Sequence, residues 1–402
     1  MVTAAACTAV ALALPTLAGA ARPERPPDVQ RGQIVSVTKV ATLPQRRVPS
    51  VIRRWREENG LRLATSTVRH GVDAYRLVYG TVGPGGTEPT TASGLVALPR
   101  GGAGTGRVVA WEHGTTVAKH DAPSTGRASD ARLVSYLFAG SGFVTVAPDY
   151  LGLGAGPGRH VFNDRASEVT ASVDMLRAAR TFVRGKGRAW DDRLLVSGFS
   201  QGGKAAIALA GALEAGIDPQ LRLRAAAGIS GVYDLEHAQT PARSRLDPLG
   251  VSFTLAYTAV SWNRVRGLYG RPGEVFRPPY GERMERLFDG HHAQGQIFAA
   301  LPPRPEQLFR PAFLRLAAHP SGALRQGMEA SDGACRYAPR APTRLYATRG
   351  DEQVSFDNTL QCRRDFADHG VRVPVIDLGE HGHFGSEIVA VPRVLEWFRR
   401  VG

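Results

Sequence analysis

The stretch RLLVSGFSQGGK at 193–204 decides the fold of this chain. An apolar run ending at Ser197 leads into GFSQG at 198–202, and an Ala-rich run extends from there to Leu213. A strand, a sharp G-x-S-x-G turn and a helix in this order make a nucleophile elbow. The glycines are needed because side chains beside a serine on so tight a turn would clash with backbone. Ser200 is therefore the candidate nucleophile, and the alternative is an ordinary Gly/Ser turn.

Strand and helix patterns alternate along most of the chain, which predicts an α/β protein with a mostly parallel sheet flanked by helices. Two β-patterned runs within 67–98 predict an antiparallel start to this sheet. Helices are expected between most of the later strands, for example at 167–183 and 355–369. The later strand candidates lie at 107–111, 143–147, 194–198, 225–230, 343–348 and 373–378.

The alternation breaks between Asp234 and Arg340, where about a hundred residues show no strong strand pattern. We interpret this segment as a mainly helical cap inserted after a core strand, with some of its aromatic residues lining an apolar pocket. The predicted division is a leader at 1–20, an N-terminal extension at 21–64, a core at 65–234 and 341–402, and the cap at 235–340. The cap aromatics are Phe253, Tyr257, Trp262, Tyr269, Phe276, Tyr280, Phe288, Phe298, Phe309 and Phe313.

Residues 1–20 are small and apolar and end in Ala18-Gly19-Ala20, an A-x-A cleavage signal with the cut expected before Ala21. The stretch is short for a membrane span and lacks the usual positive charges of a leader. We expect a secretory signal peptide and a secreted, extracellular protein. The alternative is an apolar chain end.

The formal net charge is +14, and nearly all of the basic residues are arginines scattered among acids. The sequence has no zinc-finger spacing and no basic-aromatic alternation, so it does not predict nucleic-acid binding. A solvated arginine-rich surface is the main interpretation of this charge, and contact with a lipid interface or an anionic surface is the alternative. The sequence does not predict the oligomeric state.

Removal of the leader takes Cys7 with it and leaves Cys335 and Cys362. Two cysteines in an exported protein usually pair, so we expect a disulfide between them. Closing this loop is worth about 3 kcal/mol in the chain-entropy model. The alternative is two separate buried thiols.

A serine nucleophile needs a base, and the base needs an orienting acid. Asp351 follows the strand candidate at 343–348 and is the expected acid, with a role as turn former or helix cap as the alternative. The last strand leads into GEHGHFG at 379–385, which offers two histidines. His383 is the favoured base and His381 the alternative. Since H-x-H lacks a further ligand set, no metal is predicted.

An oxyanion needs two backbone donors. One should be the N–H of Gln201, directly after the nucleophile, and the other should come from the loop HGTT at 113–116. Thr115 is the favoured residue of this loop, and His113 is expected to be structural. The segment DYLGLG at 149–154 does not match a dinucleotide-binding pattern, and we expect it to brace the rim of the site.

The motifs HGTT, APDYLGLG, GFSQGG, GDEQV and HGHFG, in this order, resemble those of the α/β-hydrolase superfamily. The DYLGLG segment and the large insertion before the acid look like its secretory-lipase-like branch. The resemblance implies the α/β-hydrolase fold, with Ser200 as nucleophile, Asp351 as acid and His383 as base. The paired His381 and His383 depart from the family pattern.

The resulting hypothesis is a secreted serine hydrolase that cleaves small-molecule or lipid esters without a cofactor. An acyltransferase or a peptidase with the same triad is the first alternative. A catalytically inactive binding protein with a hydrolase fold is the second. Acyl chain length and the natural substrate are not predicted by the sequence.

Overall fold

The computed structural model describes residues 29–58, 65–101, 106–126, 129–236 and 246–401. The signal peptide expected at 1–20 lies outside the described residues. Within these ranges, no helix is both long and apolar enough to cross a membrane.

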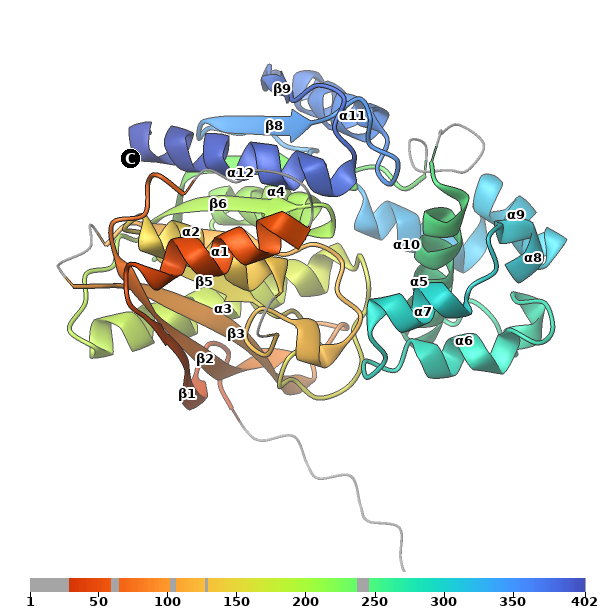
Figure 1. Ribbon diagram of the computed structural model, residues 1–402. Coiled ribbons are helices and arrows are strands. Elements are labelled where there is room, and N and C mark those ends of the chain that lie inside the picture. Colours follow the sequence, from red (N-terminus) through yellow and green to blue (C-terminus); the bar gives the residue numbers. More distant parts are fainter. Residues whose placement is uncertain (1–28, 59–64, 102–105, 127–128, 237–245, 402) are drawn as a thin grey trace, which may run out of the picture.

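One nine-stranded sheet runs through the described residues in the order β1-β2-β3-β5-β4-β6-β7-β8-β9 (Figure 1). Pairing is antiparallel from β1 to β5 along this order and parallel from β5 to β9. The expected α/β class is confirmed, with strand ends that differ by up to three residues. The strands are β1 Ile34–Leu43, β2 Gly71–Val82, β3 Pro89–Arg100, β4 Val108–Glu112, β5 Val144–Pro148, β6 Arg193–Phe199, β7 Arg222–Ile229, β8 Thr343–Ala347 and β9 Val375–Asp377.

Helices cover both faces of the sheet, so the central strands alternate between two apolar layers. In β4, Val109 and Trp111 pack in the layer of α1, α2 and α12, whereas Val108 and Ala110 pack in the layer of α3 and α4. α11 lies beside α4. Because the helices cover both faces of the sheet, a functional site can form only at the ends of the strands. These helices are α1 Arg47–Glu58, α2 Asp130–Gly140, α3 Arg165–Gly185, α4 Gln201–Glu214, α11 Phe356–Asp368 and α12 His383–Arg400.

The N-terminal part of the sheet differs from the predicted division, which put residues 21–64 outside the core. β1 lies within that range and is the edge strand of the same sheet, paired with β2. The sheet therefore begins at Ile34. The sequence pattern missed β1 because this edge strand is largely solvent-exposed, with Val35 and Val37 among its exposed residues, and lacks a clear apolar alternation.

The described residues between β7 and β8, 230–236 and 246–342, are mainly helical and form a cap. In Figure 1 its helices gather at the end of the sheet to which the β8 arrow points. The cap has an apolar core of its own, in which Tyr257 stacks on Phe288 with ring centroids 4.9 Å apart. The cap helices in the described residues are α5 Pro248–Arg266, α6 Gly281–Leu287, α7 Gln294–Ala300, α8 Pro305–Leu308, α9 Pro311–Ala318 and α10 Gly322–Ser331.

Cys335 and Cys362 form the expected disulfide. Cys335 follows the last cap helix, and Cys362 lies in α11, which begins shortly after the loop that carries Asp351. Both cysteines are buried in one apolar cluster with Phe366. The bridge therefore ties the end of the cap segment to the helix next to that loop.

We predict that the double variant Cys335→Ser/Cys362→Ser loses about 3 kcal/mol of unfolding free energy, because the unfolded chain gains the entropy that the closed loop removes. Urea unfolding measures the loss. The parent should shift to the same midpoint when a reductant is added, and the double variant should not respond. An unchanged midpoint in the variant would contradict a stabilising bridge.

Candidate active site

Ser200 occupies the turn between β6 and α4 with a strained backbone, at φ 58° and ψ −122°. A non-glycine residue adopts a positive φ only where the surroundings enforce it. The flanking glycines allow close backbone approach. A Cβ on Gly198 would lie 2.2 Å from the carbonyl oxygen of Gly202, and a Cβ on Gly202 would lie 2.1 Å from that of Glu112. The G-x-S-x-G stretch thus folds into the sharp elbow that the sequence predicts.

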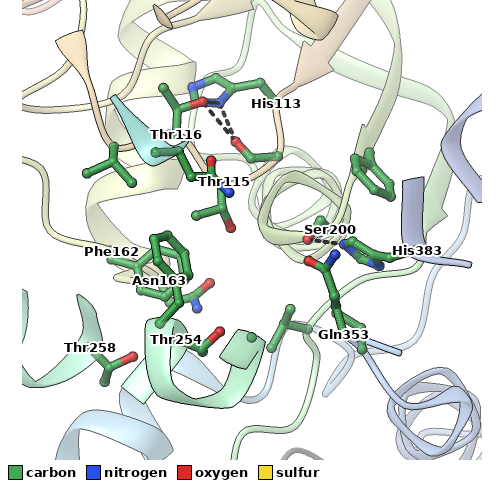
Figure 2. Close-up of a pocket in the computed structure, with 18 of the residues that line it drawn as sticks. His113, Thr115, Thr116, Phe162, Asn163, Ser200, Thr254, Thr258, Gln353 and His383 are labelled. Carbon is green, nitrogen blue, oxygen red and sulfur yellow. Dashed lines mark hydrogen bonds between the residues drawn. The ribbon is translucent and has the colours of Figure 1, made fainter. Parts of the chain in front are cut away.

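Asp351, His383 and Ser200 form one hydrogen-bonded chain, drawn in part in Figure 2. His383 Nε2 lies 2.9 Å from Ser200 Oγ, and His383 Nδ1 lies 2.8 Å from Asp351 Oδ2. All three side chains are buried. With Nδ1–H donating to the carboxylate, Nε2 is left as the acceptor for the serine hydroxyl.

Neighbouring groups fix both partners of this chain. The other oxygen of the acid, Asp351 Oδ1, accepts the backbone N–H groups of Gln353 at 3.0 Å and Val354 at 2.8 Å. The first residue of α12 is His383, and its own N–H donates to Glu352 Oε2 at 3.0 Å. The loop after β8 therefore orients the acid and the start of α12 together.

The two candidate bases occupy different places. The ring of His383 contacts Ser200, whereas His381 precedes α12 on the connecting loop and is half-buried. The geometry thus favours His383, which the sequence also favoured. Among the described residues, no group of three or more His, Cys, Asp or Glu side chains is arranged to hold a metal ion.

The two residues expected to supply oxyanion donors are Gln201 and Thr115. Gln201 is the first residue of α4, and the N–H groups of a first helical turn have no acceptor within the helix. Thr115 follows β4 and lines the same cavity as Ser200 and His383, as Figure 2 shows. Gly114 in this loop packs against the elbow, since a Cβ there would lie 3.2 Å from the Phe199 ring.

His113 is buried at the start of this loop, as expected for a structural residue. Its Nδ1 lies 2.7 Å from the carbonyl oxygen of Gly114, and its ring stacks on Tyr150 with centroids 4.2 Å apart. Burial lowers the pKa of His113, which favours the neutral ring.

The DYLGLG segment braces the rim through the buried carboxylate of Asp149. Asp149 Oδ2 accepts from Ser93 Oγ at 2.5 Å and also from Ser124 Oγ. Its Oδ1 accepts the backbone N–H of Ser124 at 2.8 Å. Gly154 must lack a side chain, because a Cβ there would lie 2.1 Å from Asp149 Oδ2. The segment connects β3 to the loop that follows Thr115.

A buried polar network behind the elbow was not predicted. Lys204 Nζ lies 3.3 Å from Glu168 Oε2, and both side chains are fully buried. Gln201 Nε2 donates to Glu168 Oε1 at 2.8 Å, and Lys204 Nζ donates to Asn163 Oδ1 at 3.2 Å and to Ser331 Oγ at 3.1 Å. The sequence did contain one signal for this network, because Lys204 stands alone at the head of an Ala-rich run. A lysine in such a run is expected to be buried, and a buried lysine needs polar partners.

A cavity of about 400 Å³ opens over Ser200 and His383, between the core and the cap. This volume suits a small organic ligand. Of the cap aromatics singled out in the sequence, Phe253, Phe298 and Phe313 line the cavity, while others form the core of the cap. The cavity walls are thus mainly apolar around a buried serine.

Solved structures share this architecture, whereas no family model and no curated protein matches the chain. The chain has the α/β-hydrolase fold, as its motifs predict. A Legionella pneumophila protein superposes with a TM-score of 0.81 at 24% identity, over 92% of this chain and 98% of that one. The rice cell wall degrading esterase LipA from Xanthomonas oryzae gives 0.77 at 24% identity, over 92% and 96%. Candida antarctica lipase A in its closed state gives 0.67 at 16% identity, over 94% and 84%.

We predict that Lys204→Met destabilises the fold by about 3–5 kcal/mol, because it leaves the buried carboxylate of Glu168 without its counter-ion. Denaturant unfolding measures the change. The double variant Glu168→Gln/Lys204→Met should recover part of the loss, since no unpaired charge remains. Equal stability of Lys204→Met and the parent would contradict the ion pair.

Proposed function

We propose that this chain is a serine hydrolase of carboxylic esters, acting through an acyl-enzyme on Ser200. The observation that carries the proposal is the hydrogen-bonded chain from Asp351 through His383 to Ser200 at the floor of an apolar cavity. The shared fold with proteins described as an esterase and a lipase supports it. The expected substrates are small-molecule or lipid esters.

In the proposed first step, His383 Nε2 takes the Ser200 hydroxyl proton while Oγ attacks the ester carbonyl carbon. Asp351 holds the imidazole tautomer and stabilises the imidazolium that forms. The carbonyl oxygen becomes an oxyanion, which the N–H groups of Gln201 and Thr115 stabilise. Collapse of this intermediate breaks the ester C–O bond, and His383 protonates the departing alcohol.

In the second step, water attacks the acyl-enzyme, and His383 removes a proton from that water. A second oxyanion forms in the same place, and its collapse releases the carboxylic acid and returns the proton to Ser200. The same residues would serve transfer to another acceptor if an alcohol or amine replaced the water.

Export is part of the proposal. A disulfide is typical of oxidising compartments, and the chain carries the bridge between Cys335 and Cys362. Together with the A-x-A signal at 18–20, this supports secretion.

We predict that Ser200→Ala abolishes turnover of short- and medium-chain nitrophenyl esters, with a fall in kcat of about 10⁶-fold, because no nucleophile remains. Release of nitrophenolate measures the rate. A fluorophosphonate probe should label the parent and not the variant, whereas an inactive binding protein would stay unlabelled in both. Undiminished turnover by folded Ser200→Ala protein would contradict the assignment, and added alcohol or amine acceptors distinguish transfer from hydrolysis.

We predict that His383→Ala lowers kcat by at least about 10⁴-fold, since the serine loses its base. His381→Ala is the matched control, because it removes a neighbouring histidine that does not contact Ser200 in the structure, and its kcat should stay within a few-fold of the parent. The opposite ranking of the two variants would assign the base to His381.

A further inference from the structure

The carboxyl group of Glu387 lies in the wall of the catalytic cavity, and the proposed triad does not use it. Glu387 is on α12, four residues after His383, so the two side chains emerge on the same face of the helix one turn apart. Only 2% of its surface is exposed. It is thus a deeply buried polar group beside the reacting centre.

One oxygen of this carboxyl group, Oε2, is buried and has no hydrogen-bond partner among the described residues. The nearest charge that acts on it is Asp130, at the start of α2, which lines the same cavity. Burial, and then the negative charge of Asp130, raise the pKa of Glu387 well above its usual value. Burial therefore favours the neutral acid form of this group, which has one O–H to donate.

An unpaired buried carboxyl costs stability, and an apolar side chain of similar size would relieve that cost. A polar group that remains unpaired in the wall of a cavity is explained if its partner arrives with the ligand. The partner must carry an oxygen or another group that can exchange a hydrogen bond with a carboxylic acid.

The position of Glu387 on α12 indicates which part of an ester meets it. In the proposed reaction, His383 hands its proton to the departing alcohol, so the alcohol oxygen lies next to the His383 ring. The next inward-facing position of the same helix face is Glu387. The alcohol part of the ester therefore extends past its carboxyl group.

We propose that Glu387 is a specificity-determining residue that hydrogen-bonds a hydroxyl group on the alcohol part of the substrate, and that the cavity selects esters of polyhydric alcohols. This inference rests on the proposed ester hydrolysis at Ser200. It deepens that proposal by naming the substrate class.

Two esters with the same acyl group test the proposal: propyl butyrate, and the monobutyrate of glycerol, which adds two hydroxyls to the alcohol. The parent should prefer the glycerol ester in kcat/KM by about tenfold, which corresponds to one net hydrogen bond of about 1.4 kcal/mol. Acid release at constant pH measures both rates. A parent ratio near one would overturn the proposal.

In Glu387→Met the ratio of the two kcat/KM values should fall to near one, because the group that distinguishes the two esters is gone. Glu387→Gln keeps a hydrogen-bonding group of the same shape and should retain the preference. Glu396→Met, an exposed glutamate on the same helix, is the matched control and should leave the ratio unchanged. A preserved ratio in Glu387→Met would overturn the proposal.

The melting temperature separates ligand binding from a structural role. Glu387→Met should melt no lower than the parent, because it removes an unpaired buried carboxyl. A marked fall in the melting temperature would show that the carboxyl group holds the fold together, and would overturn the proposal. The propyl ester of 4-hydroxybutyrate places a hydroxyl on the acyl side instead, and a preference for it that Glu387→Met abolishes would overturn the alcohol-side assignment.

A binding experiment tests the role of Glu387 without turnover. In the Ser200→Ala background, NMR titration should give a lower Kd for the glycerol ester than for propyl butyrate, and Glu387→Met should remove this difference. If the parent hydrolyses neither ester, the proposed function fails, while the binding difference still decides the role of Glu387. Equal Kd values in Ser200→Ala would overturn the inference about Glu387.

Discussion

At the elbow the backbone segments approach so closely that no side chain fits between them, and the rest of the site depends on this contact. Three backbone segments meet where Gly202 lies against the carbonyl of Glu112 at the end of β4. This contact brings the loop after β4, which holds the proposed oxyanion donor Thr115, to the first turn of α4. The strained φ of Ser200 costs about 1–3 kcal/mol of free energy. This conformation turns Oγ toward the loop that begins α12. A side chain at Gly198 or Gly202 would separate these segments and leave no common centre.

The elbow stays strained because its surroundings hold α4 from behind. A Cβ on Gly203 would lie 2.6 Å from the carbonyl oxygen of Ile229, so α4 sits directly on β7. Further in, Lys204 links α4 to Glu168 on α3 and to Ser331 at the end of α10. Core and cap thus share one buried charged group. Because a buried ion pair needs further hydrogen bonds to offset the loss of water, the bond from Lys204 to Ser331 on the cap helix adds to the support of the elbow.

Sequence reasoning found what lies close together along the chain. The elbow at 198–202 and the acid and base loops each follow a strand with a recognisable pattern, and parallel strands bring such loops to one edge. It missed β1, whose exposed edge carries little apolar pattern. It also missed Glu387 and the partners of Lys204, because their burial arises from contacts with segments far away in sequence. Only the packing of the folded chain reveals that such a titratable group is buried.

The cap forms part of the site rather than a separate cover. Tyr257 on α5 donates its hydroxyl to the carbonyl oxygen of Thr116 at 3.1 Å, and its ring stacks on Phe162 with centroids 4.5 Å apart. Any movement of α5 away from the core would break a bond to the residue next to Thr115. Admission of substrate by lifting the whole cap would therefore disturb the oxyanion loop. Phe384 lines the cavity and is 45% exposed, so the cavity wall reaches the protein surface at the first turn of α12.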